Sequence, residues 1–167
     1  MNSALKGVLS ALVLVFVGLL WISLRDTSAK EGARAPEFAL TTDQGNRITP
    51  DSFGGKVLVL NFWASWCPPC LEEIPSLNRF QREFANSGVV VVAVSIDKNE
   101  NRYKQFLSRV PVVFQTMRDP NADISAEYGT TLIPESYVIK DGRVVRKFGN
   151  AENWISDDIT QYVRSLL

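Results

Sequence analysis

Apolar residues follow two different patterns along the chain, and the change of pattern separates predicted strands from predicted helices. Residues 57–62 and 89–96 are almost continuous apolar runs, which is typical of strands that are buried on both faces of a sheet. Between these runs, apolar residues recur at helical spacing, at Ile74, Leu77, Phe80 and Phe84. The pattern predicts two central parallel strands that are joined by a crossover helix.

Shorter patterns on either side of this unit predict the remaining elements. Residues 38–40 with 47–48, and 136–140 with 143–148, indicate two hairpins, the second one closed by the turn sequence Asp141-Gly142. In chain order we further expect a helix between Asn99 and Pro111, a short strand at 111–114, a short helix at 122–128 and a last helix after Ser156. Together these elements predict one α/β domain with a mixed sheet.

The N-terminal segment has a different pattern, because the 18 residues at positions 7–24 carry no charge. A helix of this length is about 27 Å long, close to the hydrocarbon thickness of a bilayer. A cleaved signal peptide is the alternative, since small residues stand at Thr27-Ser28-Ala29. Lys6 and the terminal amine favour a cytoplasmic N-terminus, with the rest of the chain outside the cytoplasm. We therefore expect a membrane anchor (or signal peptide) at 1–24, a linker at 25–35 and the globular domain at 36–167.

The composition excludes several classes of function. Lys+Arg and Asp+Glu number 18 each, so no net charge attracts nucleic acid. The sequence contains no histidine, which removes the commonest metal ligand and the commonest general base. The two cysteines alone are too few for a structural zinc site. We expect no metal, no other cofactor and no nucleic-acid partner.

The two cysteines, Cys67 and Cys70, stand where the first buried strand gives way to its helix, in the sequence Asn61-Phe-Trp-Ala-Ser-Trp-Cys67-Pro-Pro-Cys70. A Cys-x-x-Cys pair in this context indicates reversible redox chemistry. A helix N-terminus stabilises a thiolate, so Cys67 is predicted to attack and Cys70, one turn further, to resolve the mixed disulfide. The alternative, a static disulfide or two inert thiols, is less favoured because so small a loop gains little chain entropy.

Pro68 and Pro69 separate the cysteines, and neither has an amide hydrogen to donate to the sulfur of Cys67. With fewer donors, the thiolate is less stabilised. Strong disulfide-forming oxidants owe their potential to a stabilised reduced form. The dipeptide therefore favours a reductant.

These residues, followed by Leu-Glu-Glu-Ile-Pro75, resemble the thioredoxin superfamily, and most closely its membrane-anchored TlpA/ResA/CcmG-like branch. The resemblance covers about residues 36–167, including Gly129-Thr-Thr-Leu-Ile-Pro134 and an inserted segment after Ile96, and the apolar N-terminus is a further shared feature. The resemblance implies a thioredoxin fold and a thiol:disulfide oxidoreductase that supplies reductant to exported thiols, often those of apocytochrome c. It also implies a membrane thiol reductase that recharges the pair, and a domain on the periplasmic side of the cytoplasmic membrane.

Further site residues follow from spacing and from the resemblance. Glu73 shares a helix face with Cys70 and is predicted to exchange a proton with it, because Asn61 stands where thioredoxin has a buried aspartate. The alternative is an exposed helix glutamate, which we prefer for Glu72. The resemblance implies that Pro134 is a cis-proline facing the disulfide, although an ordinary trans-proline at a strand start is the commoner case.

A second group of residues is predicted to contact the substrate, namely Trp66, Pro68, Pro69, Ile133 and Glu135. For Glu135 an exposed charge at a strand start is the alternative. Three other functions stay open: an exported oxidase that introduces disulfides, a thiol peroxidase, and a copper-binding module, although neither methionine fits a copper site. The reduction potential separates the oxidase from the reductant, and a peroxide-consumption assay identifies the peroxidase.

Overall fold

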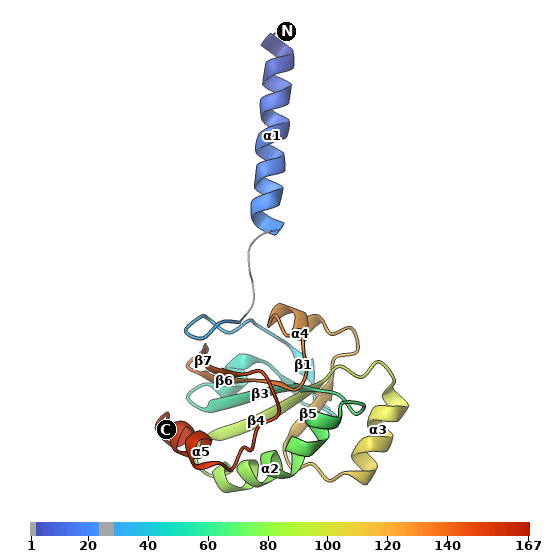
Figure 1. The fold of residues 1–167 in the computed structure, drawn as a ribbon, viewed down its shortest axis with the longest axis vertical. Coiled ribbons are helices and arrows are strands. Elements are labelled where there is room, and N and C mark those ends of the chain that lie inside the picture. The colour runs from blue at the N-terminus through green and yellow to red at the C-terminus, as the bar shows by residue number, and fades with distance from the viewer. Residues whose placement is uncertain (1–2, 24–28) are drawn as a thin grey trace.

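A computed structural model describes residues 3–23 and 29–167 (Figure 1). Helix α1 (Ser3–Ser23) lies in the first range, and all other elements lie in the second. Within these two ranges no helix is both long and apolar enough to cross a membrane. Leu24, at the end of the predicted anchor, and residues 25–28 of the predicted linker lie outside the described residues.

A five-stranded sheet in the order β5-β4-β3-β6-β7 forms the centre of the domain (Figure 1). Its strands are β3 (Val57–Trp63), β4 (Val89–Ser95), β5 (Gln115–Arg118), β6 (Glu135–Lys140) and β7 (Arg143–Phe148). β3, β4 and β5 are parallel, whereas β6 and β7 run antiparallel to their neighbours. The prediction of an α/β domain with a mixed sheet is confirmed.

β3 is buried along its whole length, and its side chains alternate between two cores. Val57 and Val59 face a core that includes residues of α2 (Pro68–Phe84), α3 (Glu100–Arg109) and α5 (Asp157–Arg164). Leu58 and Leu60 face the other core, which includes α4 (Asp123–Glu127) and the small hairpin β1 (Leu40–Thr41) and β2 (Arg47–Ile48). Burial on both faces explains why an apolar run without alternation forms the central strand.

Most predicted elements occur where the sequence pattern placed them. Asn99 caps α3, and its side chain accepts a hydrogen bond from the amide of Arg102 at 3.0 Å. Asp141 and Gly142 have φ angles of 50° and 71°, as the predicted two-residue hairpin turn requires. Ser156 precedes α5, although its side chain makes no capping hydrogen bond.

The predicted strand at residues 111–114 is wrong, because β5 begins only at Gln115. The side chain of Asn78, in α2, donates to the carbonyl oxygen of Pro111 and accepts from the amide of Val113, both at 2.8 Å. These two bonds hold the segment against a helix. The side chain of Asn78 therefore makes hydrogen bonds with backbone groups that a neighbouring strand would otherwise pair with.

Residues 29–35 belong to the packed domain, whereas the sequence predicted a linker there. Ala29 and Ala35 are buried. Backbone amides of Ala29, Gly32 and Ala35 donate to carbonyl oxygens of Tyr128, Val144 and Gly142 at 3.0, 2.7 and 2.9 Å. Because backbone groups make these contacts, the segment packs without periodic apolar residues. The pattern of side chains therefore does not predict the contacts.

Candidate active site

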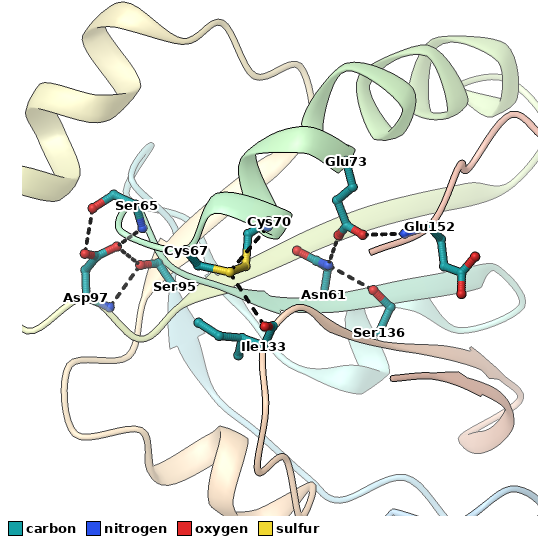
Figure 2. The surroundings of a disulfide bond; sticks show 10 residues. All are labelled: Asn61, Ser65, Cys67, Cys70, Glu73, Ser95, Asp97, Ile133, Ser136 and Glu152. Carbon is teal, nitrogen blue, oxygen red and sulfur yellow. Dashed lines mark hydrogen bonds between the residues drawn. A yellow bond between two sulfur atoms is a disulfide. The ribbon is translucent and has the colours of Figure 1, made fainter. Parts of the chain in front are cut away.

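The two cysteines form a disulfide at the start of α2, directly beyond the end of β3 (Figure 2). Cys67 is the N-cap of the helix, and its Sγ accepts a hydrogen bond from the amide of Cys70 at 3.3 Å. Pro68 and Pro69 are the first two helical residues, where amides have no partner within the helix, so proline is tolerated there. The sequence thus begins a helix at the disulfide while leaving the sulfur of Cys67 with few donors.

Cys67 is the cysteine that a partner can reach. Its side chain lines an open groove of about 410 Å³ beside the disulfide, together with Trp66, Pro68, Pro69, Leu132 and Ile133 among others. Cys70 does not line this groove and is only 1% exposed, against 4% for Cys67. Trp66 and Leu132 flank the groove as exposed apolar side chains, at 60% and 72% exposure. The groove therefore brings four of the predicted substrate contacts, Trp66, Pro68, Pro69 and Ile133, together with Cys67.

Pro134 lies in the loop that enters β6, and the Ile133–Pro134 peptide bond is cis, as the resemblance implied. The carbonyl oxygen of Ile133 lies 3.6 Å from Cys67 Sγ (Figure 2). Residues 130–133 of this loop line the groove together with Cys67. The role of the loop in substrate binding stays a prediction.

Glu135 is buried under this loop, so the alternative of an exposed charge is wrong for it. Its carboxylate pairs with Lys147 at 2.7 Å and accepts hydrogen bonds from the hydroxyls of Thr130 and Tyr137. Glu135 is also absent from the lining of the groove. These contacts tie Thr130 of the loop to β6 and β7 through the Glu135 carboxylate. The sequence predicted direct contact between Glu135 and the substrate instead.

Glu73 is buried as well, at 3% exposure, and Figure 2 shows its carboxylate next to Asn61. Asn61, in β3, donates its amide hydrogens to Glu73 Oε1 at 2.6 Å and to Ser136 Oγ at 2.9 Å. The backbone amide of Glu152 donates to Glu73 Oε2 at 3.0 Å. The exposed alternative holds for Glu72 and not for Glu73.

Burial raises the pKa of Glu73 to about 7, although the hydrogen bonds from Glu152 and Asn61 act in the opposite direction. A carboxyl group with this pKa exchanges its proton readily near neutral pH. No hydrogen bond joins Glu73 to Cys70 within the described ranges of this oxidised form. The predicted proton exchange with Cys70 therefore stays a prediction, which the pKa of the carboxyl group favours.

Asp97 is a site residue that the sequence reasoning missed. This buried carboxylate follows β4 and accepts hydrogen bonds from the amide and hydroxyl of Ser65 at 2.8 and 2.7 Å, and from the hydroxyl of Ser95 at 2.7 Å (Figure 2). It holds the turn between β3 and Cys67. A signal existed, because Ser65 and Asp97 each follow a predicted parallel strand, and such strand ends meet at one edge of a sheet.

Comparison with known proteins finds a redox family and relatives named as thiol-disulfide oxidoreductases. Residues 30–164 match the Redoxin family. The chain is 29% identical over 136 residues to the thiol-disulfide oxidoreductase ResA of Bacillus thuringiensis subsp. konkukian, an alignment that covers 81% of this chain and 78% of that protein. It is 31% identical over 150 residues to the thioredoxin-like protein YneN of Bacillus subtilis, covering 85% of this chain and 86% of the relative.

Among solved structures, the chain is similar to a proposed thiol:disulfide interchange protein DsbE from Chlorobium tepidum. The TM-score is 0.77 at 31% sequence identity, and the match covers 83% of this chain and 99% of the other. The thioredoxin fold that the motif implied is thereby confirmed.

The pKa of Glu73 predicts a pH-dependent stability. Because the folded pKa of about 7 lies above the ordinary value of 4.5, the folded chain holds a proton that the unfolded chain releases. The folded state therefore loses stability as the pH rises between these values, by on the order of 3 kcal/mol. Glu73→Gln abolishes this loss, so the stability of the variant relative to the parent chain rises with pH over this interval.

The measurement is the free energy of unfolding by urea at several pH values for the oxidised protein. Glu72→Gln is the matched control, since it removes an exposed carboxylate from the same helix turn. A difference between Glu73→Gln and the parent chain that does not change with pH contradicts the raised pKa.

Proposed function

The chain belongs to the Redoxin family and is a thiol:disulfide oxidoreductase, and we propose that it works as a reductant of disulfides in exported proteins. One observation carries the proposal. The capping sulfur of Cys67 accepts a hydrogen bond from the Cys70 amide alone among the described residues, because Pro69 has no amide hydrogen to offer. A weakly stabilised thiolate leaves the dithiol form a good electron donor.

In the proposed reaction, the Cys67 thiolate attacks one sulfur of a partner's disulfide and releases the other as a thiolate. The partner is then bound to Cys67 by a mixed disulfide. Cys70 loses its proton and attacks Cys67 Sγ, which forms the Cys67–Cys70 disulfide and expels the partner's second thiolate. Two electrons pass to the partner, and Glu73 accepts the proton of Cys70.

We extend the proposal to the substrates that the motif resemblance implies, namely exported proteins whose disulfides must be reduced to thiols, such as apocytochrome c. The groove supports a protein substrate, because the exposed side chains of Trp66 and Leu132 offer apolar contact beside Cys67. A membrane thiol reductase would return the disulfide to the dithiol after each turnover.

We also propose that the N-terminal segment anchors the protein in the cytoplasmic membrane, with residues 36–167 on the periplasmic side. The uncharged sequence at positions 7–24 supports this location. The described part of α1 also exposes large apolar side chains, such as Leu14 and Phe16. Such a surface is stable in contact with lipid.

Reduction potential tests the direction of electron flow. We expect a potential on the order of 100 mV or more below the roughly −120 mV of a strong disulfide-forming oxidant. Pro69→Ala should raise the potential by tens of mV, because it restores an amide at the second helical position, which can donate to an N-cap. Equilibration of the chain with glutathione buffers measures both values.

Pro68→Ala is the matched control, since its amide stands at the first helical position and does not reach the capping atom. A potential close to that of the oxidant would reverse the proposed direction. Equal shifts of the reduction potential in Pro68→Ala and Pro69→Ala would contradict the explanation by a hydrogen bond from position 69.

Only Cys67 of the two cysteines lines the groove, and this predicts different behaviour on substitution. Cys70→Ser should accumulate mixed disulfides with partner proteins, because the attacking thiol remains and the resolving thiol is lost. Cys67→Ser should accumulate none. Non-reducing gels of whole cells that express each variant show the adducts, and equal trapping by both variants would refute the assignment of roles.

The proposed anchor predicts that the intact chain stays with membranes through washing in alkaline carbonate and keeps its N-terminus. Immunoblotting of the washed fractions, with N-terminal sequencing of the recovered protein, provides the measurement. Recovery of a released form that begins near Lys30 would show cleavage instead.

A further inference from the structure

Resolution of the mixed disulfide, in the function proposed above, poses a problem of proton transfer. Cys70 must lose a proton before it attacks, yet its side chain is 1% exposed and does not line the groove. While the partner is bound to Cys67 through a disulfide, it also covers the groove side of the site. The proton of Cys70 therefore needs an exit that the partner does not block.

A second opening reaches Glu73 from a different side. A recess of about 270 Å³ is lined by Glu72, Glu73, Ser76, Ala151, Glu152 and Asn153. None of these residues lines the groove beside Cys67. Figure 2 shows Glu73 and Glu152 on one side of Asn61 and the disulfide on the other. Glu72 and Asn153 are exposed, so the recess opens to solvent.

Hydrogen bonds between α2 and the segment after β7 build the walls of this recess. The hydroxyl of Ser76 lies 2.9 Å from the carbonyl oxygen of Glu73 and 3.2 Å from that of Glu152. The amide of Trp154 donates to the same hydroxyl at 3.3 Å, and the amide of Glu152 donates to Glu73 Oε2 at 3.0 Å. One oxygen of the buried carboxylate is thus held at the inner end of an opening to solvent.

We propose that this recess is the proton outlet of the active site, through which Glu73 releases to water the proton that it takes from Cys70. In this step the S–H bond of Cys70 breaks and an O–H bond forms on Glu73. The Cys70 sulfur then bonds to Cys67 Sγ, and the partner leaves as a thiolate with the electron pair of the broken bond. Glu73 next loses its proton to a water molecule in the recess.

The charges around Glu73 agree with this role. Glu72 and Glu152 line the recess, and their carboxylates favour the approach of a positively charged proton carrier. On the side of β3, Glu73 Oε1 accepts a hydrogen bond from the neutral amide of Asn61, which in turn donates to the hydroxyl of Ser136. The carboxylates of the recess thus lie on the path to solvent, while Asn61, the partner of Glu73 in β3, carries no charge.

The experiment fills the recess while leaving Glu73 in place. Ala151→Phe puts a large side chain at its wall, and Ala151→Leu is a smaller version of the same change. Ala85→Phe is the matched control, because Ala85 is an exposed alanine at the far end of α2. Stopped-flow fluorescence with a peptide disulfide as the probe gives separate rates for the attack by Cys67 and for the release of the second peptide thiol.

We expect Ala151→Phe to slow release of the second peptide thiol near pH 7 on the order of tenfold. This is part of the rate contribution that a positioned proton-transfer group makes. The attack rate should stay within about twofold, because Cys67 does not use the recess, and this rate also reports that the variant is folded. Ala151→Leu should have a smaller effect on release, and Ala85→Phe none.

Release at the parent rate in both Ala151 variants would overturn the outlet, and so would equal slowing of attack and release. Glu73→Gln, measured in parallel, separates this failure from that of the proposed function. If Glu73→Gln slows release and Ala151→Phe does not, Glu73 manages the proton by another route and only the outlet is refuted. If neither variant slows release, the role of Glu73 in the proposed reaction fails too.

Discussion

The position of β3, paired on both sides and buried on both faces, is the constraint on which the site depends. Parallel pairing with β4 brings the carboxyl ends of both strands to one edge of the sheet, which places Asp97 beside the turn that leads to Cys67. Antiparallel pairing with β6 brings the start of that strand to the same edge, and with it Pro134. Three loops, distant in sequence, therefore meet at the disulfide because one strand lies between the other two.

Local chemistry explains which parts of this arrangement the sequence could predict. The cysteine pair, the turn at Asp141-Gly142 and the buried strands depend on neighbouring residues, so their patterns are visible in the chain. The contacts that were missed join distant segments through single polar side chains. Asn78 holds residues 111–113, and Asp97 holds Ser65. The spacing of apolar residues carries no information about such contacts. The burial of Glu135 likewise depends on its ion pair with Lys147 in the next strand.

Three buried carboxylates among the described residues lie on the segments that lead to the disulfide, and their sets of partners differ. Glu135 has a cation, Lys147, and Asp97 accepts three hydrogen bonds from two serines. Glu73 has two amide donors, which offset its burial only in part. The first two arrangements suit groups that hold loops in place. The third suits a group that changes its protonation state, so the partners of each carboxylate distinguish support from chemistry.

The segment at residues 29–35 has a consequence for the outer edge of β7. β7 is the last strand in the sheet order, and Gly32, Ala33 and Ala35 make backbone hydrogen bonds along its outer side, with Val144 and Gly142. An uncovered outer strand would present unpaired amides and carbonyls to other chains and invite edge-to-edge aggregation. A stretch without any periodic pattern of its own thus covers the first part of the β7 edge, where a second molecule could otherwise pair.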